Sequence, residues 1–186
     1  MIAKIITLIL LTFFTFNGCG KKEESKINES VETTPKVEEQ ANVINLKTTD
    51  GQIIKLTALD NGIDFESYKN KIVLLSFFAT WCGPCKTEIP HLNNIQTSYK
   101  DKIQIIGVLL EESKTNSQME NFIQNFNIIY PITNSRENFR LSDALGGIRS
   151  LPTMVMYDKN GEYFTHFVGA VPQEMIEKEI QKALAK

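Results

Sequence analysis

The sequence of 186 residues is poor in cysteine and histidine, with three of the first and two of the second. So few cysteines exclude the disulfide framework that holds many small exported domains together. A structural zinc site needs four ligands, and one Cys-x-x-Cys pair with two widely separated histidines does not supply them. We therefore assign no role to His91 or His166, and the paired cysteines are left free for chemistry.

An excess of charge of one sign is also absent, because the formal net charge is −2. Proteins that bind nucleic acid usually carry a basic patch or stripe, so we expect no nucleic-acid partner. The hydrophobic share of 42% is ordinary for a globular core. At this length the chain has room for one domain with tails, and a second full domain is not expected.

A hydrophobic run long enough to span a bilayer is lacking as well. Lys4 is followed by twelve largely apolar residues, Ile5 to Phe16, which is typical of an export signal. The next residues, Phe16-Asn17-Gly18-Cys19, resemble the lipobox of bacterial lipoproteins, which implies a signal peptide over residues 1–18 and a lipid on Cys19. Phe16 and Asn17 depart from the usual leucine and small residue, so a protein without lipid and an uncleaved anchor stay open as alternatives.

Residues 20–42 contain no aromatic side chain and are rich in Lys, Glu, Ser and Thr. Such a composition buries too little apolar surface to fold, so residues 19–42 are predicted to be the lipidated N-terminus and a disordered tether. A tether of about twenty residues spans roughly 25 Å. We expect residues 43–186 to form one domain, held outside the cytoplasm, in the periplasm, by a membrane lipid anchor.

The chemistry-bearing motif is Trp81-Cys82-Gly83-Pro84-Cys85-Lys86, which lies between an apolar run and a helical pattern. Two cysteines at the start of a helix can close a small disulfide ring. The unpaired backbone N–H groups and the helix dipole there stabilise a thiolate, which is the attacking species in thiol-disulfide exchange. Haem attachment is excluded, because Lys86 stands where that motif needs histidine.

The remaining pattern predicts an order of β-α-β, an extra helix and strand, and then β-β-α. The continuous apolar run Ile72 to Phe78 is typical of a central strand buried on both faces, and Pro90 should kink the helix that follows. We expect core-facing stripes on two later helices. The predicted elements are a hairpin over 43–46 and 52–56, strands over 72–78 and 103–110, helices from the dithiol to about 99 and over 115–126, a short edge strand over 128–133, a brief helix over 138–145, a hairpin over 153–157 and 162–168, and a last helix from 172. The core-facing residues are Met119, Phe122, Ile123 and Phe126 on one helix, and Met175, Ile176, Ile180, Ala183 and Leu184 on the other.

From Val43 to Lys186 the chain resembles the thioredoxin superfamily, and within it the exported TlpA/ResA-like thiol-disulfide oxidoreductases. The resemblance implies an α/β, thioredoxin-like fold with a central mixed sheet flanked by helices, an N-terminal hairpin, and a helix-strand insertion over residues 115–133. The motifs that carry it are Phe77-Phe78-Ala79-Thr80-Trp81-Cys82-Gly83-Pro84-Cys85-Lys86, Pro90, Gly147-Ile148-Arg149-Ser150-Leu151-Pro152-Thr153, Asn160-Gly161 and Gly169.

Cys82 is the expected nucleophile, exposed at the helix start, and Cys85 the residue that resolves the mixed disulfide. A permanent structural disulfide is the weaker alternative, because a two-residue ring constrains little chain. Glu88, one helical turn beyond Cys85, matches a functional glutamate of ResA-like proteins and would exchange protons with the dithiol. The alternative is an exposed helix acid. Thioredoxin carries a buried acid where this chain has Ser76, which strengthens the case for Glu88.

Pro152 resembles the cis-proline that faces the dithiol throughout the superfamily, with Leu151 and Thr153 beside the substrate groove. Ordinary turn chemistry is the alternative for this segment. Trp81 is expected to cover one side of the dithiol, although a plain core tryptophan stays open. Together with Gly83 and Pro84, these residues complete the predicted substrate-binding set: Trp81, Gly83, Pro84, Leu151, Pro152 and Thr153.

The resemblance implies a reductant of disulfides in exported proteins, such as apocytochromes c, that needs no metal or organic cofactor. Electrons would come from a membrane thiol carrier of the DsbD/CcdA kind. Three alternatives stay open: a disulfide oxidase or isomerase, a lipoprotein binding module whose dithiol is incidental, and a peroxidase. Reduction potential separates the first from a reductant, because about −270 mV is typical of thioredoxin and about −120 mV of a strong oxidant.

Overall fold

The computed structural model describes residues 42–186. The predicted signal peptide, Cys19 and the tether up to residue 41 lie outside the described residues. Within 42–186, no helix combines the length and apolar character needed to cross a bilayer.

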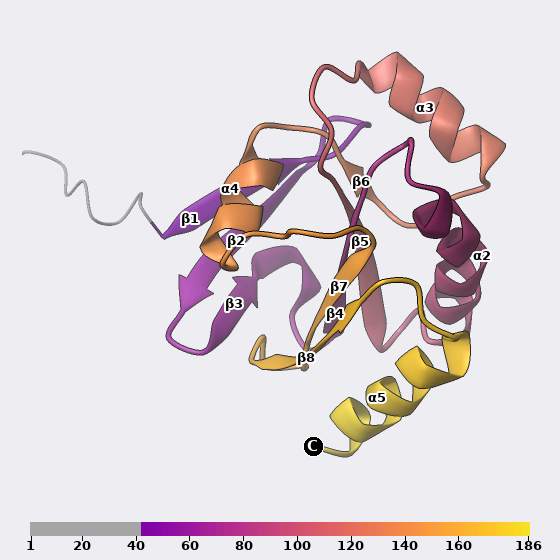
Figure 1. The fold of residues 1–186 in the computed structure, drawn as a ribbon. Coiled ribbons are helices and arrows are strands. Elements are labelled where there is room, and N and C mark those ends of the chain that lie inside the picture. The colour runs from indigo at the N-terminus through magenta and orange to yellow at the C-terminus, as the bar shows by residue number, and fades with distance from the viewer. Residues whose placement is uncertain (1–41) are drawn as a thin grey trace, which may run out of the picture. The chain divides into compact units, whose positions relative to one another are not determined.

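A five-stranded mixed sheet forms the centre of the domain, in the order β6-β5-β4-β7-β8 (Figure 1). Every residue of β4 is buried, as the apolar run Ile72 to Phe78 predicts. β5 runs parallel to β4, whereas β7 runs antiparallel to it and pairs with β8, which confirms the predicted C-terminal hairpin. The bounds are β4 Ile72–Phe78, β5 Ile103–Leu109, β6 Ile132–Thr133, β7 Thr153–Tyr157 and β8 Tyr163–Val168.

Two hydrophobic clusters cover the two faces of this sheet. Successive side chains of a strand point to opposite faces, so Ile72 and Leu74 of β4 join one cluster while Val73 and Leu75 join the other. The first cluster lies under three helices, and the second lies under a smaller sheet and one helix (Figure 1). The three helices are α2 Gly83–Ser98, α3 Asn116–Asn125 and α5 Gln173–Ala185, and the single helix is α4 Glu137–Ala144.

The smaller sheet is antiparallel, with strands β1 Val43–Lys47, β2 Ile53–Leu59 and β3 Gly62–Phe65 in that order. The predicted N-terminal hairpin is thus confirmed as β1 and β2. The third strand, and the 3₁₀ turn Glu66–Tyr68 after it, were not predicted. A turn signal was present, because the polar residues Asp60-Asn61 join β2 to β3 and Gly62 is the first residue of β3.

One of the contacts between the two sheets depends on glycine. The N–H of Ile63 donates to the carbonyl of Gly161 at 2.8 Å, and the N–H of Tyr163 donates to the carbonyl of Asn61 at 2.9 Å. Gly161 has φ +79°, and a Cβ on it would overlap the carbonyl oxygen of Ile63. Only glycine permits this backbone approach.

The predicted core face of α3 is confirmed but is only partly buried, and the predicted face of α5 needs correction at Met175. On α3 only Met119 is fully buried, while Phe122, Ile123 and Phe126 are partly buried, because α3 lies at the rim of its cluster. On α5, Met175 is 48% exposed. The buried residues of α5 follow Ile176 at four and seven residues, so Met175 lies about 100° away around the helix.

The strand predicted over residues 128–133 is reduced to β6, Ile132–Thr133. The edge of β5 that β6 leaves free is covered by Gln96 of α2. The N–H of Ile105 donates to Oε1 of Gln96 at 2.8 Å, and Nε2 of Gln96 donates to the carbonyl of Ile103 at 3.2 Å. A side-chain amide thus replaces the hydrogen bonds of a longer neighbouring strand.

Candidate active site

The dithiol lies where β4 gives way to α2. The helix starts at Gly83, and Cys82 is its N-cap, with Pro84 in the first turn. Cys82 and Cys85 form a disulfide with 5.3 Å between their Cα atoms. The N–H of Cys85 donates to Sγ of Cys82 at 3.2 Å, so this sulfur occupies the place of a capping oxygen. A thiolate formed there would be stabilised by the same N–H and by the helix dipole.

The structure corrects the expected exposure of Cys82. Cys82 is 4% exposed and Cys85 5% exposed, and both belong to the cluster beneath α2. Capping directs the Cys82 sulfur back toward the helix backbone, which explains its burial. Trp81 is 67% exposed, so the alternative of a core tryptophan is wrong. Gly83 is exposed as well, and so is Pro84.

Glu88 is buried, with 2% exposure, so the alternative of an exposed helix acid is also wrong. The N–H of Val171, in the loop before α5, donates to Oε1 of Glu88 at 3.2 Å, while Oε2 has no hydrogen-bond partner. Burial raises the pKa of Glu88 to about 7, and the Val171 hydrogen bond offsets a part of that rise. A carboxyl group that titrates near neutrality is suited to passing protons.

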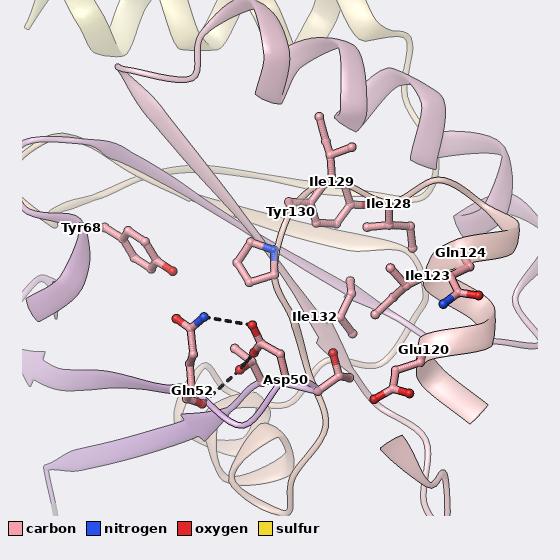
Figure 2. A pocket seen from close by; sticks show the side chains of 13 residues that line it. Asp50, Gln52, Tyr68, Glu120, Ile123, Gln124, Ile128, Ile129, Tyr130 and Ile132 are labelled. Carbon is pink, nitrogen blue, oxygen red and sulfur yellow. Dashed lines mark hydrogen bonds between the residues drawn. The ribbon is translucent and has the colours of Figure 1, made fainter. Parts of the chain in front are cut away.

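Tyr130 lies close enough to feel the charge of Glu88. Burial raises the pKa of the Tyr130 hydroxyl, and the negative charge of Glu88 raises it further. Tyr130 also lines a pocket of about 490 Å³, bounded by the β1–β2 turn, by α3 and by the segment before β6. Figure 2 shows Asp50 and Gln52 joined by a hydrogen bond on one side of this pocket, with Tyr130 on the other. Neither cysteine lines it.

The Leu151–Pro152 peptide bond is cis, as the motif predicts. Thr153 pairs with Phe77 across β7 and β4, so this bond lies at the end of β4 from which the dithiol loop departs. The hydroxyl of Thr153 donates to the carbonyl of Ser150 at 2.8 Å. Leu151 is partly buried and Pro152 is buried. A pocket of about 470 Å³ opens beside this segment, and its lining residues are Leu145, Gly147, Ile148, Arg149, Ser150, Thr153, Val155, Tyr163, His166 and Val168.

Sequence reasoning missed Glu111, which contacts the loop before the dithiol. Oε2 of Glu111 accepts hydrogen bonds from the N–H and the hydroxyl of Thr80, at 2.8 and 2.7 Å, and Oε1 lies 3.2 Å from Nζ of Lys114. Burial raises the pKa of Glu111, but the Thr80 hydrogen bonds and Lys114 together hold it below its usual value. A signal was available, because β4 and β5 are parallel and their carboxyl ends meet at one edge of the sheet.

Within residues 42–186, no three side chains of His, Cys, Asp or Glu gather as metal ligands. The family model for Redoxin matches residues 36–184. The chain belongs to the Redoxin family.

The relatives of this redoxin by sequence include a thiol-disulfide oxidoreductase and a thioredoxin-like protein. ResA of Bacillus thuringiensis subsp. konkukian is 29% identical over 121 residues, which is 64% of this chain and 68% of that protein. The thioredoxin-like protein YneN of Bacillus subtilis is 28% identical over 177 residues, or 95% of this chain and 92% of YneN. A thiol:disulfide interchange protein of the thioredoxin family from Chlorobium tepidum has a similar structure, with a TM-score of 0.61 and 26% identity over 77% of this chain and 94% of that one.

These findings confirm the thioredoxin-like fold and the TlpA/ResA-like affiliation. This redoxin is a thiol-disulfide oxidoreductase of the ResA type.

Proposed function

We propose that this redoxin is a membrane-tethered, extracytoplasmic reductant of disulfides in exported proteins, and that Cys82 and Cys85 carry the reaction. The observation that carries the proposal is the Cys82–Cys85 disulfide at the N-terminus of α2, with the Cys82 sulfur accepting a backbone hydrogen bond. That geometry makes Cys82 the thiol whose ionised form is the better stabilised.

The reaction begins from the reduced dithiol. The Cys82 thiolate attacks one sulfur of the partner's disulfide, forming a mixed disulfide and releasing the other partner sulfur as a thiolate. Cys85 then loses its proton and attacks the Cys82 sulfur, which closes the Cys82–Cys85 disulfide and releases the second partner thiolate. Two electrons pass from the redoxin to the partner, and both partner thiolates take up protons.

We assign to Glu88 the role of accepting and returning the proton of Cys85. It lies one turn further along α2, and its Oε2 is buried without a partner. As a carboxylate it would accept the Cys85 proton before ring closure. As a carboxylic acid it would return that proton when an electron donor reopens the disulfide.

Substrate would dock across the cis-peptide segment and the exposed rim of the dithiol. Leu151, Pro152 and Thr153 lie at the end of β4 where the dithiol loop departs, beside a pocket of about 470 Å³ that Thr153 lines. Trp81, with 67% exposure, supplies an apolar surface next to Cys82. Gly83 and Pro84 are exposed without long side chains that would hinder a partner's approach.

The reducing direction is supported by Gly83-Pro84 between the cysteines, as in reducing thioredoxins. Apocytochromes c are the substrates that we propose, with a membrane thiol carrier of the DsbD/CcdA kind as the electron donor. Lipid on Cys19, with residues 20–42 as a tether, would keep the domain beside that donor.

The test is a trap. Cys85→Ser should leave the mixed disulfide on Cys82 unresolved, so exported proteins should remain covalently attached and separate only after reduction. Cys82→Ser is the matched control and should capture nothing. Capture of haem-binding proteins would support the proposed substrates, whereas a trap that stays empty in cells would point to a binding module with an incidental dithiol. A reduction potential near −120 mV instead of about −270 mV would reverse the proposed direction.

A further inference from the structure

A carboxylate that is not part of the dithiol motif holds the loop in front of it. Glu111 follows β5, and its Oε2 accepts both donors of Thr80, the N–H at 2.8 Å and the hydroxyl at 2.7 Å. The backbones of the two segments are joined as well, since the N–H of Leu110 donates to the carbonyl of Phe78 at 2.8 Å. The Glu111 side chain is 15% exposed and pairs with Lys114 at 3.2 Å.

Thr80, the residue that Glu111 holds, lies only two residues before Cys82. The N–H of Cys82 donates to the carbonyl of Ala79 at 3.1 Å, so Thr80 and Trp81 are the central residues of one tight turn. Residues two apart along a chain have Cα atoms no more than about 7 Å apart. Fixing Thr80 therefore fixes the entry of the chain into α2 and, with it, the position of Cys82.

The contact also places a negative charge on the loop, two residues before Cys82. A carboxylate beside a forming thiolate disfavours that thiolate, and an ammonium group favours it. Lys86 and Glu88 follow Cys85 on α2, whereas Glu111 and Lys114 form the ion pair that is joined to the loop through Thr80.

We propose that Glu111 and Lys114 act as a positioning pair for the dithiol, in which Glu111 orients the loop through Thr80 and its charge keeps the Cys82–Cys85 couple reducing. The inference rests on the proposed function, because it takes Cys82 as the nucleophile. A charge that destabilises the thiolate destabilises the reduced form, which lowers the reduction potential.

The role of the charges on Glu111 and Lys114 is tested in the full chain by two substitutions that should have opposite effects. Glu111→Gln keeps an oxygen for Thr80 and removes the negative charge, so equilibrium with a glutathione redox buffer should shift three- to tenfold toward the dithiol, and tenfold is about 30 mV. Alkylation of Cys82 should then reach its midpoint at a lower pH. Lys114→Met should shift both quantities the other way. Glu120→Gln, which removes one charge from α3, is the matched control and should shift neither.

The positioning role is tested at Thr80. Thr80→Val removes the hydroxyl donor while keeping the side-chain shape, and should slow reduction of insulin by the reduced protein, whereas Thr80→Ser should retain the wild-type rate. Opposite shifts for Glu111→Gln and Lys114→Met, with rescue by serine, support the pair. Equal shifts in one direction, or none, overturn it while leaving the wild-type exchange intact. A wild-type protein that exchanges with neither glutathione nor insulin would instead contradict the proposed function.

Discussion

At the scale of single residues, α2 carries, one turn beyond the two cysteines, a carboxyl group that the fold has removed from water. The Oε2 atom of Glu88 has no hydrogen-bond partner, and Glu88 has only 2% of its surface exposed. An ionised carboxylate in such a place costs free energy, which is why its pKa is raised to about 7. A buried side chain that served only to stabilise the fold would carry no charge at any pH.

The first prediction concerns the pH dependence that follows. Between pH 4.5 and 7 the folded protein holds a proton on Glu88 that the unfolded chain has released, so the stability from this group is full below pH 4.5 and is lost as pH rises through 7. Glu88→Gln removes that loss. In urea unfolding of the oxidised protein, the variant should gain on the wild type by about 1 to 3 kcal/mol between pH 5 and pH 8.

Glu174→Gln, at an exposed position of α5, is the control and should show no such divergence. In exchange assays Glu88→Gln should be slow, because the Cys85 proton has lost its acceptor. A wild type and a Glu88→Gln variant with parallel stability curves and equal rates would remove Glu88 from the site.

Motif residues could be predicted from the sequence at this scale, and their surroundings could not. The cis bond at Pro152 followed from a motif whose geometry is local. The burial of Cys82 depends on the packing of the whole cluster beneath α2, and the contact of Glu111 with Thr80 joins residues 31 apart in the chain. Neither leaves a periodic signal in the sequence.

At the scale of elements, the strength of the local signal decided which predictions held. The run of β4, apolar at every position but Ser76, and the Asn160-Gly161 turn of the β7–β8 hairpin were predicted correctly. β3 is four residues long, too short for alternation to stand out. The inward face of α3 was predicted correctly but its depth was not, because periodicity shows which side of a helix turns inward but not how deeply it is buried.

The second prediction concerns the contact between the two sheets. Gly161→Ala should destabilise the protein by about 2 to 4 kcal/mol, because it adds a backbone overlap with Ile63 to the cost of a positive φ. Gly51 is the matched control, since it has φ +91° with open space around its Cβ position. Gly51→Ala should cost only about 1 kcal/mol. Chemical denaturation of both variants measures the difference. Equal losses of unfolding free energy would show that the backbone at the sheet contact shifts to accommodate the added methyl group.

At the scale of the whole molecule, closing or opening one disulfide is coupled to global stability. A couple more reducing than the same cysteines in an unfolded chain must have its oxidised form stabilised by folding, whereas a strong oxidant has its reduced form stabilised. The unfolding stabilities of the oxidised and reduced forms therefore indicate whether the enzyme acts as a reductant or as an oxidant.

The third prediction is that the oxidised protein is the more stable by on the order of 1 to 3 kcal/mol. Guanidinium unfolding of both forms, with the reduced form kept under excess dithiothreitol, measures the difference. Cys82→Ser, which cannot form the Cys82–Cys85 disulfide, should unfold identically under both conditions. Greater stability of the reduced protein would favour the oxidase alternative.

The recessed position of the two sulfurs also has a consequence for what can meet them. With only 4% of Cys82 and 5% of Cys85 accessible, a partner must bring its cystine close to recessed sulfurs, which is harder for a flat protein surface with a rigid internal cystine than for a protruding segment. We therefore expect the substrate proteins to carry the reactive disulfide on a flexible, protruding segment. The degree of folding of a substrate would then affect its selection as much as its sequence does.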